Sequence, residues 1–230
     1  MNFVSHYFLD RETEDAAYLL GVISPDLVSI FDRSVRLKEN SLPLIMENES
    51  RPEEISFYNG LLRHFEVDAL FHSSDFFTSE TGRIGEMIRD VFEPQQVRRS
   101  FFVAHVLLEL LLDKILIQRQ PTLLDNFYRI LHTITPEETV RLTKWATHAE
   151  LPAYGTYFEK FIKRQYLYNY ADWEHVIYVL RRIMNRVGIK DLEYLHQPQF
   201  LDLMVRYEAE LAERSSFAFL QFEQQLCNAC

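Results

Sequence analysis

Histidines and acidic residues recur at every fourth position in two separate stretches of this chain, 61–72 (LLRHFEVDALFH) and 101–117 (FFVAHVLLELLLDKILI). The first stretch contributes His64, Asp68 and His72, and the second contributes His105, Glu109 and Asp113. Four residues of an α-helix advance roughly 400°, so the members of each trio drift only about 40° per step and stack about 6 Å apart. Each stretch therefore predicts a helix with one narrow stripe of imidazoles and carboxylates.

A polar stripe on a helix most often faces solvent, and histidine, aspartate and glutamate are ordinary residues there. The stretch 101–117 departs from that pattern because its polar residues are only four: His105, Glu109, Asp113 and Lys114. A helix so apolar is expected to be buried on nearly all sides. Buried carboxylates are costly without a partner, and a metal ion or a fixed ion pair is the usual remedy. The two stripes together therefore favour a metal site.

If both helices turn their stripes toward a common point, three imidazoles and three carboxylates meet, which is enough for two divalent ions. These donors suit Zn, Fe, Mn or Ni better than Mg, which prefers oxygen ligands and water. A metal pair roughly 3.5 to 4 Å apart activates a shared water and stabilises a displacement at phosphorus. Asp68, in the middle of its trio, is the expected bridging ligand. Asp113 is expected to orient a metal ligand from one turn further away.

Length and composition predict an all-α protein. The 230 residues are 47% apolar and 25% charged, with six glycines and few β-branched alternations, which indicates one globular domain over 1–230 built as a bundle of roughly eight to ten helices. A break and restart is expected at Ser24-Pro25, and a surface loop at 33–52. The remaining patterns predict helices over 16–23, 52–72, 79–92, 96–118, 121–133, 136–149, 155–169, 172–187 and 198–226.

Charge and cysteine usage limit the partners. A net charge of −10 disfavours nucleic acid, although 155–190 holds seven basic residues against three acids and could receive an acidic partner or a phosphorylated ligand. The polar residues within 101–117 argue against a membrane span, and the start of the chain lacks the pattern of a secretory signal, so a cytoplasmic location is expected. Cys227 and Cys230 are read as part of an unstructured end.

Four segments resemble the acyl-carrier-protein phosphodiesterase family, which is similar to a permuted HD-type metal phosphohydrolase. They are NFVSHYFL at the start, GVISPDLVSIF from Gly21, LLRHFEVDALFHSSDFF from Leu61 and YLYNYADWEHVIYVLRRIMNRVG from Tyr166. The resemblance implies an all-helical fold with an HD-like metal site that hydrolyses the phosphodiester joining 4′-phosphopantetheine to an acidic carrier protein. On this resemblance His6 and Asp26 match the family's early ligands, and His64 and Asp68 match its H-R-x-I-D helix.

The chain departs from that family at several of these positions. Phe65 stands where the family has Arg, and His72 where it has a second Asp; His105 and Glu109 with Leu110 stand where it has Asp and then Asp-His. All the ligand positions stay competent to bind metal. The resulting H-x-x-x-D and H-x-x-x-E pairs look more like the pattern of zinc-dependent phospholipase C and S1/P1 nuclease, a second group of helical phosphodiesterases. The two resemblances imply the same type of reaction but different substrates.

These observations predict a metal-dependent phosphohydrolase, and specifically a phosphodiesterase acting on a small or carrier-linked phosphate. Its expected metal ligands are His6, Asp26, His64, Asp68, His72, His105 and Glu109. The alternative is a helical binding module that keeps a structural metal site without turnover. Turnover of a phosphate ester separates the two.

Overall fold

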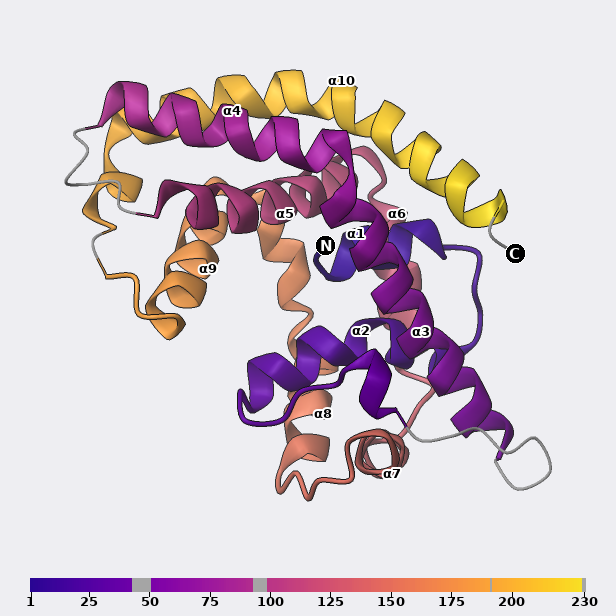
Figure 1. The fold of residues 1–230 in the computed structure, drawn as a ribbon. Helices are drawn as coiled ribbons and strands as arrows, with labels where there is room; N and C mark the ends of the chain where they lie inside the picture. The colour runs from indigo at the N-terminus through magenta and orange to yellow at the C-terminus, as the bar shows by residue number, and fades with distance from the viewer. Residues whose placement is uncertain (43–50, 93–98, 191, 229–230) are drawn as a thin grey trace. The chain divides into compact units, whose positions relative to one another are not determined.

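All the regular secondary structure in the described part of the chain is helical. The structure, a computed structural model, describes residues 1–42, 51–92, 99–190 and 192–228, and these hold ten α-helices, three short 3-10 helices and no strand (Figure 1). The predicted all-α bundle of roughly eight to ten helices is therefore confirmed. Within the same residues, no helix combines the length and the apolar character needed to cross a membrane, as the sequence predicted.

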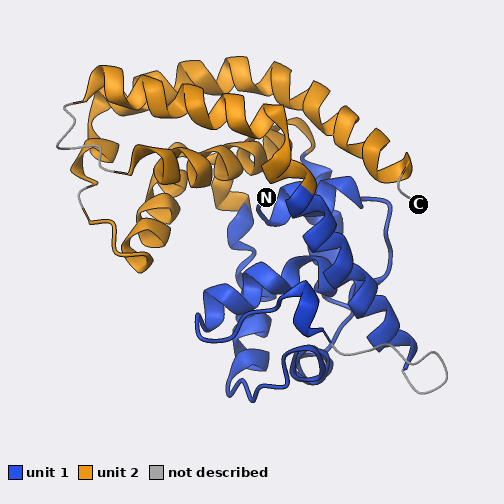
Figure 2. Cartoon of the chain, viewed as in Figure 1, with its two compact units in different colours: residues 1–69, 121–167 blue, residues 70–120, 168–230 orange. Residues whose placement is uncertain are grey.

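The helices gather into two compact units, 1–69 with 121–167 and 70–120 with 168–230 (Figure 2). Unit 1 holds α1 (Phe3–Leu9), α2 (Ala16–Phe31), most of α3 (Pro52–Ser73), α6 (Thr122–Leu131), α7 (Pro136–Thr147) and α8 (Tyr154–Arg164). Unit 2 holds the end of α3, α4 (Asp75–Val91), α5 (Ser100–Arg119), α9 (Trp173–Arg186) and α10 (Pro198–Asn228). The prediction of a single domain over 1–230 stays a prediction.

In unit 1, capped helices enclose an aromatic core. The Asp15 carboxylate caps α2 by accepting from the backbone N–H groups of Ala17 and Tyr18, a role the acid-rich start of this helix leads one to expect. The Tyr7 ring of α1 packs edge-on against Phe127 of α6, with 5.4 Å between ring centroids. The core therefore holds the short helix α1, and with it His6, against the rest of the unit.

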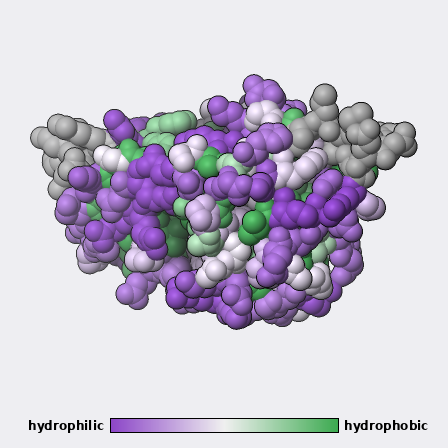
Figure 3. Space-filling view, turned by 90° about the horizontal axis from the view of Figure 1, so that it is seen from below, coloured by the Kyte–Doolittle hydropathy of each residue, from purple (hydrophilic) through white to green (hydrophobic). Residues whose placement is uncertain are grey.

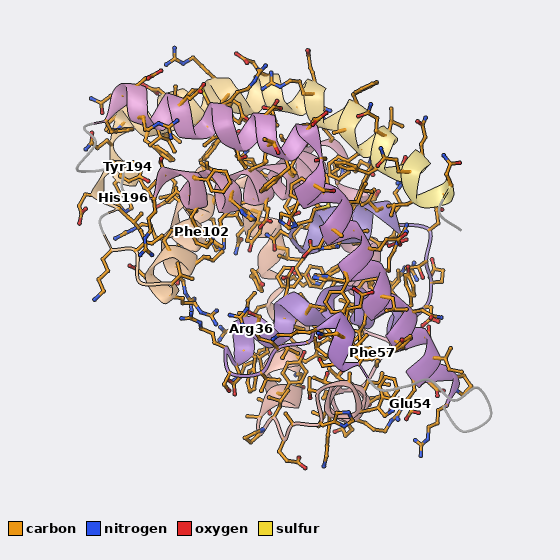
Figure 4. All side chains as sticks on the ribbon, in the orientation of Figure 1. Arg36, Glu54, Phe57, Phe102, Tyr194 and His196 are labelled. Atoms are coloured by element: carbon orange, nitrogen blue, oxygen red, sulfur yellow. The ribbon has the colours of Figure 1, made fainter. Side chains whose placement is uncertain are left out.

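Helices α2 and α3 approach each other closely at Gly21 and Gly60. A methyl group on Gly21 would lie 2.2 Å from the carbonyl oxygen of Phe57, a residue of α3 labelled in Figure 4, and one on Gly60 would lie 2.1 Å from that of Tyr18. Any larger side chain would push the helices apart, because those distances are far inside van der Waals contact. The two glycines therefore set the spacing between these helices.

The break predicted at Ser24-Pro25 is wrong: α2 runs without interruption from Ala16 to Phe31, with Pro25 inside it. Proline removes one N–H donor and crowds the carbonyl four residues earlier, which here belongs to Gly21. The Ser24 hydroxyl donates to the Leu20 carbonyl at 2.6 Å, so a backbone acceptor one turn before Pro25 has a hydrogen-bond partner. The helix therefore continues far enough to carry Asp26 on its side.

Other helix boundaries also differ from those predicted. Helix α4 begins at Asp75 because the Ser74 hydroxyl caps it by accepting from the Phe77 N–H. Helix α8 ends at Arg164, since Gln165 adopts a left-handed backbone with φ 46°, and a 3-10 helix then covers 166–171. Residues 43–50 of the predicted loop and 96–98 of the predicted helix lie outside the described residues. The end of the chain is not unstructured as expected, because α10 extends through Cys227; Cys230 lies outside the described residues.

Unit 2 is organised around α5, which α4 and α10 accompany along its length (Figure 1). The prediction that this helix is buried is confirmed, since Asp113 and Lys114 are enclosed along with nearly all its apolar residues. The Lys114 ammonium donates to Glu208 of α10 at 2.7 Å. Elsewhere in this unit Arg214 holds the buried Glu80 with two hydrogen bonds of 2.9 Å. Buried charges are thus paired, as their desolvation requires.

The predicted basic stretch 155–190 divides between the two units. Its first part lies on α8 in unit 1, where Lys163 pairs with Glu159 at 2.7 Å, and its second part lies on α9 in unit 2. The face of the molecule in Figure 3 is mostly hydrophilic, with hydrophobic residues scattered among the polar ones. A basic docking face therefore stays a prediction.

Candidate metal sites

The first cluster of candidate ligands lies in unit 1 and comprises His6 of α1, Asp26 of α2 and His64 of α3. One ligand atom from each lies within 4.8 Å of the others. The two imidazole rings stack with 4.1 Å between centroids and an interplanar angle of 18°. Three helices far apart in the sequence thus bring two nitrogens and a carboxylate oxygen to one place.

A backbone carbonyl fixes the orientation of the His64 ring. The Nδ1 atom lies 2.8 Å from the carbonyl oxygen of Val22 on α2, and only a protonated Nδ1 can make that hydrogen bond. The neutral ring then presents an unprotonated Nε2 to the cluster. Metal-binding histidines are commonly held in this way, with one nitrogen donating to a carbonyl and the other carrying the lone pair.

Asp68 adds a second carboxylate to this cluster from one turn further along α3. Its Oδ1 lies 3.3 Å from Nε2 of His6, and its Oδ2 lies 3.5 Å from Nε2 of His64. The α-amino group of Met1 also reaches Oδ1, at 2.6 Å. About one third of the Asp68 side chain is exposed, whereas His6 and His64 are only 1% and 3% exposed. The cluster of His6, Asp26, His64 and Asp68 is called site 1 below.

Burial and neighbouring charge determine protonation in site 1. The pKa of His64 is held well below its ordinary value, mainly by burial and next by the adjacent His6 ring. The His64 ring is therefore neutral at pH 7. For Asp68, burial acts to raise the pKa, but the hydrogen bond to His6 and the positive charge of the Met1 amino group outweigh it and hold the pKa well below its usual range. A neutral His64 imidazole beside an ionised Asp68 carboxylate is the combination of protonation states that binds a divalent cation.

The second cluster lies in unit 2 and comprises His72 at the end of α3 with His105 and Glu109 of α5; it is called site 2 below. The Nε2 atoms of the two histidines are 3.2 Å apart. The Oε1 atom of Glu109 lies 3.2 Å from Nε2 of His72 and 3.0 Å from Nε2 of His105. Burial acts to raise the pKa of Glu109, but hydrogen bonds from His105 and His72 hold it below its usual range.

The structure brings all seven predicted metal ligands into clusters, but in two groups and not one. His64 meets His6, Asp26 and Asp68, while His105 meets His72 and Glu109, and the two groups belong to different units. These two groups are the candidate metal clusters found among the described residues. Neither includes Asp113, which is fully buried on α5. The sequence gives no sign of the Val22 carbonyl or the Met1 amino group, because both are backbone atoms.

The four remaining histidines lie outside both clusters, and one of them, His175, is partly exposed in the first turn of α9. His132 and His148 follow the last residues of α6 and α7 and are exposed. His196 lies in a 3-10 helix near Tyr194 (Figure 4), where it contacts Arg181. These positions do not add ligands to either site.

Comparison of the chain with protein-family models, curated proteins and solved structures finds no match. The resemblance to carrier-protein phosphodiesterases therefore stays a prediction.

Proposed function

We propose that this protein is a metal-dependent hydrolase of phosphate esters, with site 1 as its metal centre. The observation that carries the proposal is the hydrogen bond from His64 to the Val22 carbonyl, which turns the unprotonated Nε2 toward an ionised Asp68 3.5 Å away. A lone pair and a carboxylate oxygen repel each other unless a cation lies between them. Site 1 is therefore suited to hold one.

The donor set of site 1 limits the chemistry. Two imidazoles with two carboxylates suit Zn, Fe or Mn better than Mg. A metal of this kind, when bound, acidifies a coordinated water and stabilises charge developing on phosphate oxygens. The partly exposed Asp68 marks the solvent side of the cluster, where its ionised carboxylate would bind the metal or orient a water. Hydrolysis of a phosphodiester or monoester fits these groups.

Two substrate classes fit this proposal: a phosphorylated small molecule and a phosphopantetheinylated carrier protein. The second follows from the family resemblance, which the loss of Arg at Phe65 weakens. Release of 4′-phosphopantetheine from a carrier protein, measured beside hydrolysis of a generic phosphodiester such as bis-p-nitrophenyl phosphate, distinguishes them.

The test compares Asp68→Asn with Glu66→Gln after loading with Mn or Zn. Glu66 is a matched control because it is a carboxylate on the same helix, two residues away, and its side chain is 42% exposed beside Arg63. We expect Asp68→Asn to keep its helical circular dichroism and to lose about one bound ion and at least 100-fold in phosphoesterase rate. We expect Glu66→Gln to retain both. Unchanged ion content and rate in Asp68→Asn contradict the proposal.

A structural metal is the second candidate, and the burial of His6 and His64 favours it. Structural sites are closed and fully coordinated by protein, and both imidazoles of site 1 are almost completely enclosed. In that case the loaded protein cleaves neither generic phosphodiesters nor monoesters, while removal of metal lowers its melting temperature. Turnover by the loaded protein excludes this second candidate.

A further inference from the structure

The geometry points to a second metal site in unit 2, in which His72, His105 and Glu109 bind one zinc-type ion and leave a coordination position open to an outside ligand. This inference does not rest on the proposed function, because it concerns binding and a different unit. It also differs from the single two-ion site that the sequence predicted.

The spacing of the three donor atoms fits one ion. Ligand atoms 2.0 to 2.2 Å from a tetrahedral zinc ion are roughly 3.3 to 3.6 Å apart. In site 2 the three separations are 3.2, 3.2 and 3.0 Å, so a shift of a few tenths of an ångström places all three at bonding distance. Each residue contributes the atom that ordinarily binds metal, Nε2 from the histidines and one carboxylate oxygen from Glu109.

While Glu109 is ionised, hydrogen bonds cannot make all three of these contacts favourable at once. Each Nε2 carries either a hydrogen or a lone pair. If both carry hydrogens, the two N–H groups face each other across 3.2 Å; if either lacks one, its lone pair faces the Glu109 carboxylate. While Glu109 is ionised, one of the contacts is therefore repulsive whichever of the two nitrogens carries a hydrogen, whereas a single cation makes all three attractive.

The helices hold these side chains in place without closing the site. His105 and Glu109 lie one turn apart on α5, and the Phe77 ring of α4 packs edge-on against His105 at 4.8 Å and against His72 at 5.0 Å. The ligand side chains keep 16% to 32% of their surface exposed. The apolar ring backs one side of the site, and solvent reaches the other.

Three protein ligands with a solvent-facing side are typical of zinc sites that bind water or substrate, and two histidines with one glutamate are one of the known donor sets. The nitrogen donors disfavour Mg, which prefers oxygen. The open position would take a water molecule or an anionic oxygen ligand such as phosphate. Site 2 is thus a centre for ligand binding in its own right.

Cobalt titration of the metal-free protein tests the inference, because Co²⁺ with four or five ligands shows intense visible bands that the six-coordinate ion lacks. We expect wild type to bind two equivalents, and His105→Gln and Glu109→Gln to bind one less with loss of the site 2 bands. His132→Gln is the matched control, since His132 is exposed and belongs to neither cluster. Wild-type stoichiometry in both site 2 variants, folded by circular dichroism, overturns the inference.

Inorganic phosphate tests the open position. We expect its addition to change the visible spectrum of cobalt-loaded His64→Gln, which retains site 2, but not that of the double variant His64→Gln/His105→Gln, which lacks a ligand at each site. A spectrum of cobalt-loaded His64→Gln that phosphate does not change overturns the open position. Because these readouts are independent of turnover, a protein that binds cobalt at site 2 but cleaves no phosphate ester contradicts only the proposed function.

Discussion

Gly21 and Gly60 pack directly against each other where α2 meets α3: a methyl group on either one would lie 3.0 Å from the Cα atom of the other. This contact controls site 1 because the hydrogen bond from His64 to the Val22 carbonyl spans the same pair of helices. Val22 follows Gly21 directly, and His64 lies one turn after Gly60. The closeness of the two glycines therefore sets the orientation of a candidate metal ligand.

Gly60→Ala is expected to weaken both the fold and site 1. The added methyl group meets a backbone carbonyl, which cannot rotate away as a side chain can, so the helices must separate at a cost of about 1 to 3 kcal/mol. Separation lengthens the bond between His64 and Val22 and lowers metal affinity. Urea unfolding and metal titration of the variant measure the two effects.

Gly82→Ala is the matched control. Gly82 lies within α4, and a methyl group there meets nothing within 4 Å. Alanine is expected to stabilise the helix by about 0.5 to 1 kcal/mol and to leave metal binding unchanged. Equal stability changes in the two variants would contradict the role assigned to the contact between α2 and α3.

Residue types and spacing predicted the candidate ligands but not their grouping. The apolar surroundings of His105 and Glu109 correctly indicated a buried helix, because four polar residues in a long apolar stretch leave little surface for water. Which stripe meets which neighbour depends on tertiary packing, and the four-residue period is the same for either arrangement. The Val22 carbonyl could not be predicted either, since every residue has one and only the crossing of α2 with α3 selects it.

Tyr207→Phe is expected to destabilise unit 2. The Tyr207 hydroxyl donates to Glu80 at 2.6 Å, and this carboxylate is only 2% exposed. Loss of one donor to a buried carboxylate costs about 1.5 to 3 kcal/mol, although Arg214 still pairs with it. Denaturant unfolding of the variant gives the change in the free energy of unfolding.

Tyr194→Phe is the comparison for that substitution. The Tyr194 hydroxyl is also buried, but it has no hydrogen-bond partner among the described residues, and burial alone raises its pKa. Removing an unsatisfied polar group is expected to leave stability unchanged or to increase it slightly. A larger loss in Tyr194→Phe than in Tyr207→Phe would contradict the importance of the bond to Glu80.

The free energy of unfolding is expected to fall at alkaline pH, and the raised pKa of Tyr7 sets the pH range in which its contribution is lost. Burial, the largest cause, raises the pKa of Tyr7 to about 12. Because the unfolded chain ionises near pH 10 and the folded chain does not, the stability from this neutral phenol is complete below pH 10 and is lost as the pH rises toward 12. Ultraviolet absorbance of phenolate, followed beside circular dichroism, measures this. Tyr7→Phe should unfold at a higher pH than wild type, and an unchanged alkaline midpoint would count against Tyr7 as a contributor.

Metal removal is expected to lower the melting temperature. An ion that binds only the folded state at 100 times its dissociation constant adds about 2.7 kcal/mol. For a chain of this size that corresponds to a shift on the order of 5 to 10 °C. Calorimetry of chelator-treated and zinc-loaded protein measures it, with magnesium as the comparison ion because nitrogen-rich sites bind it weakly. His6→Gln should reduce the zinc-dependent increment by removing one nitrogen donor from site 1, whereas an increment as large as that of wild type would show that His6 holds no metal.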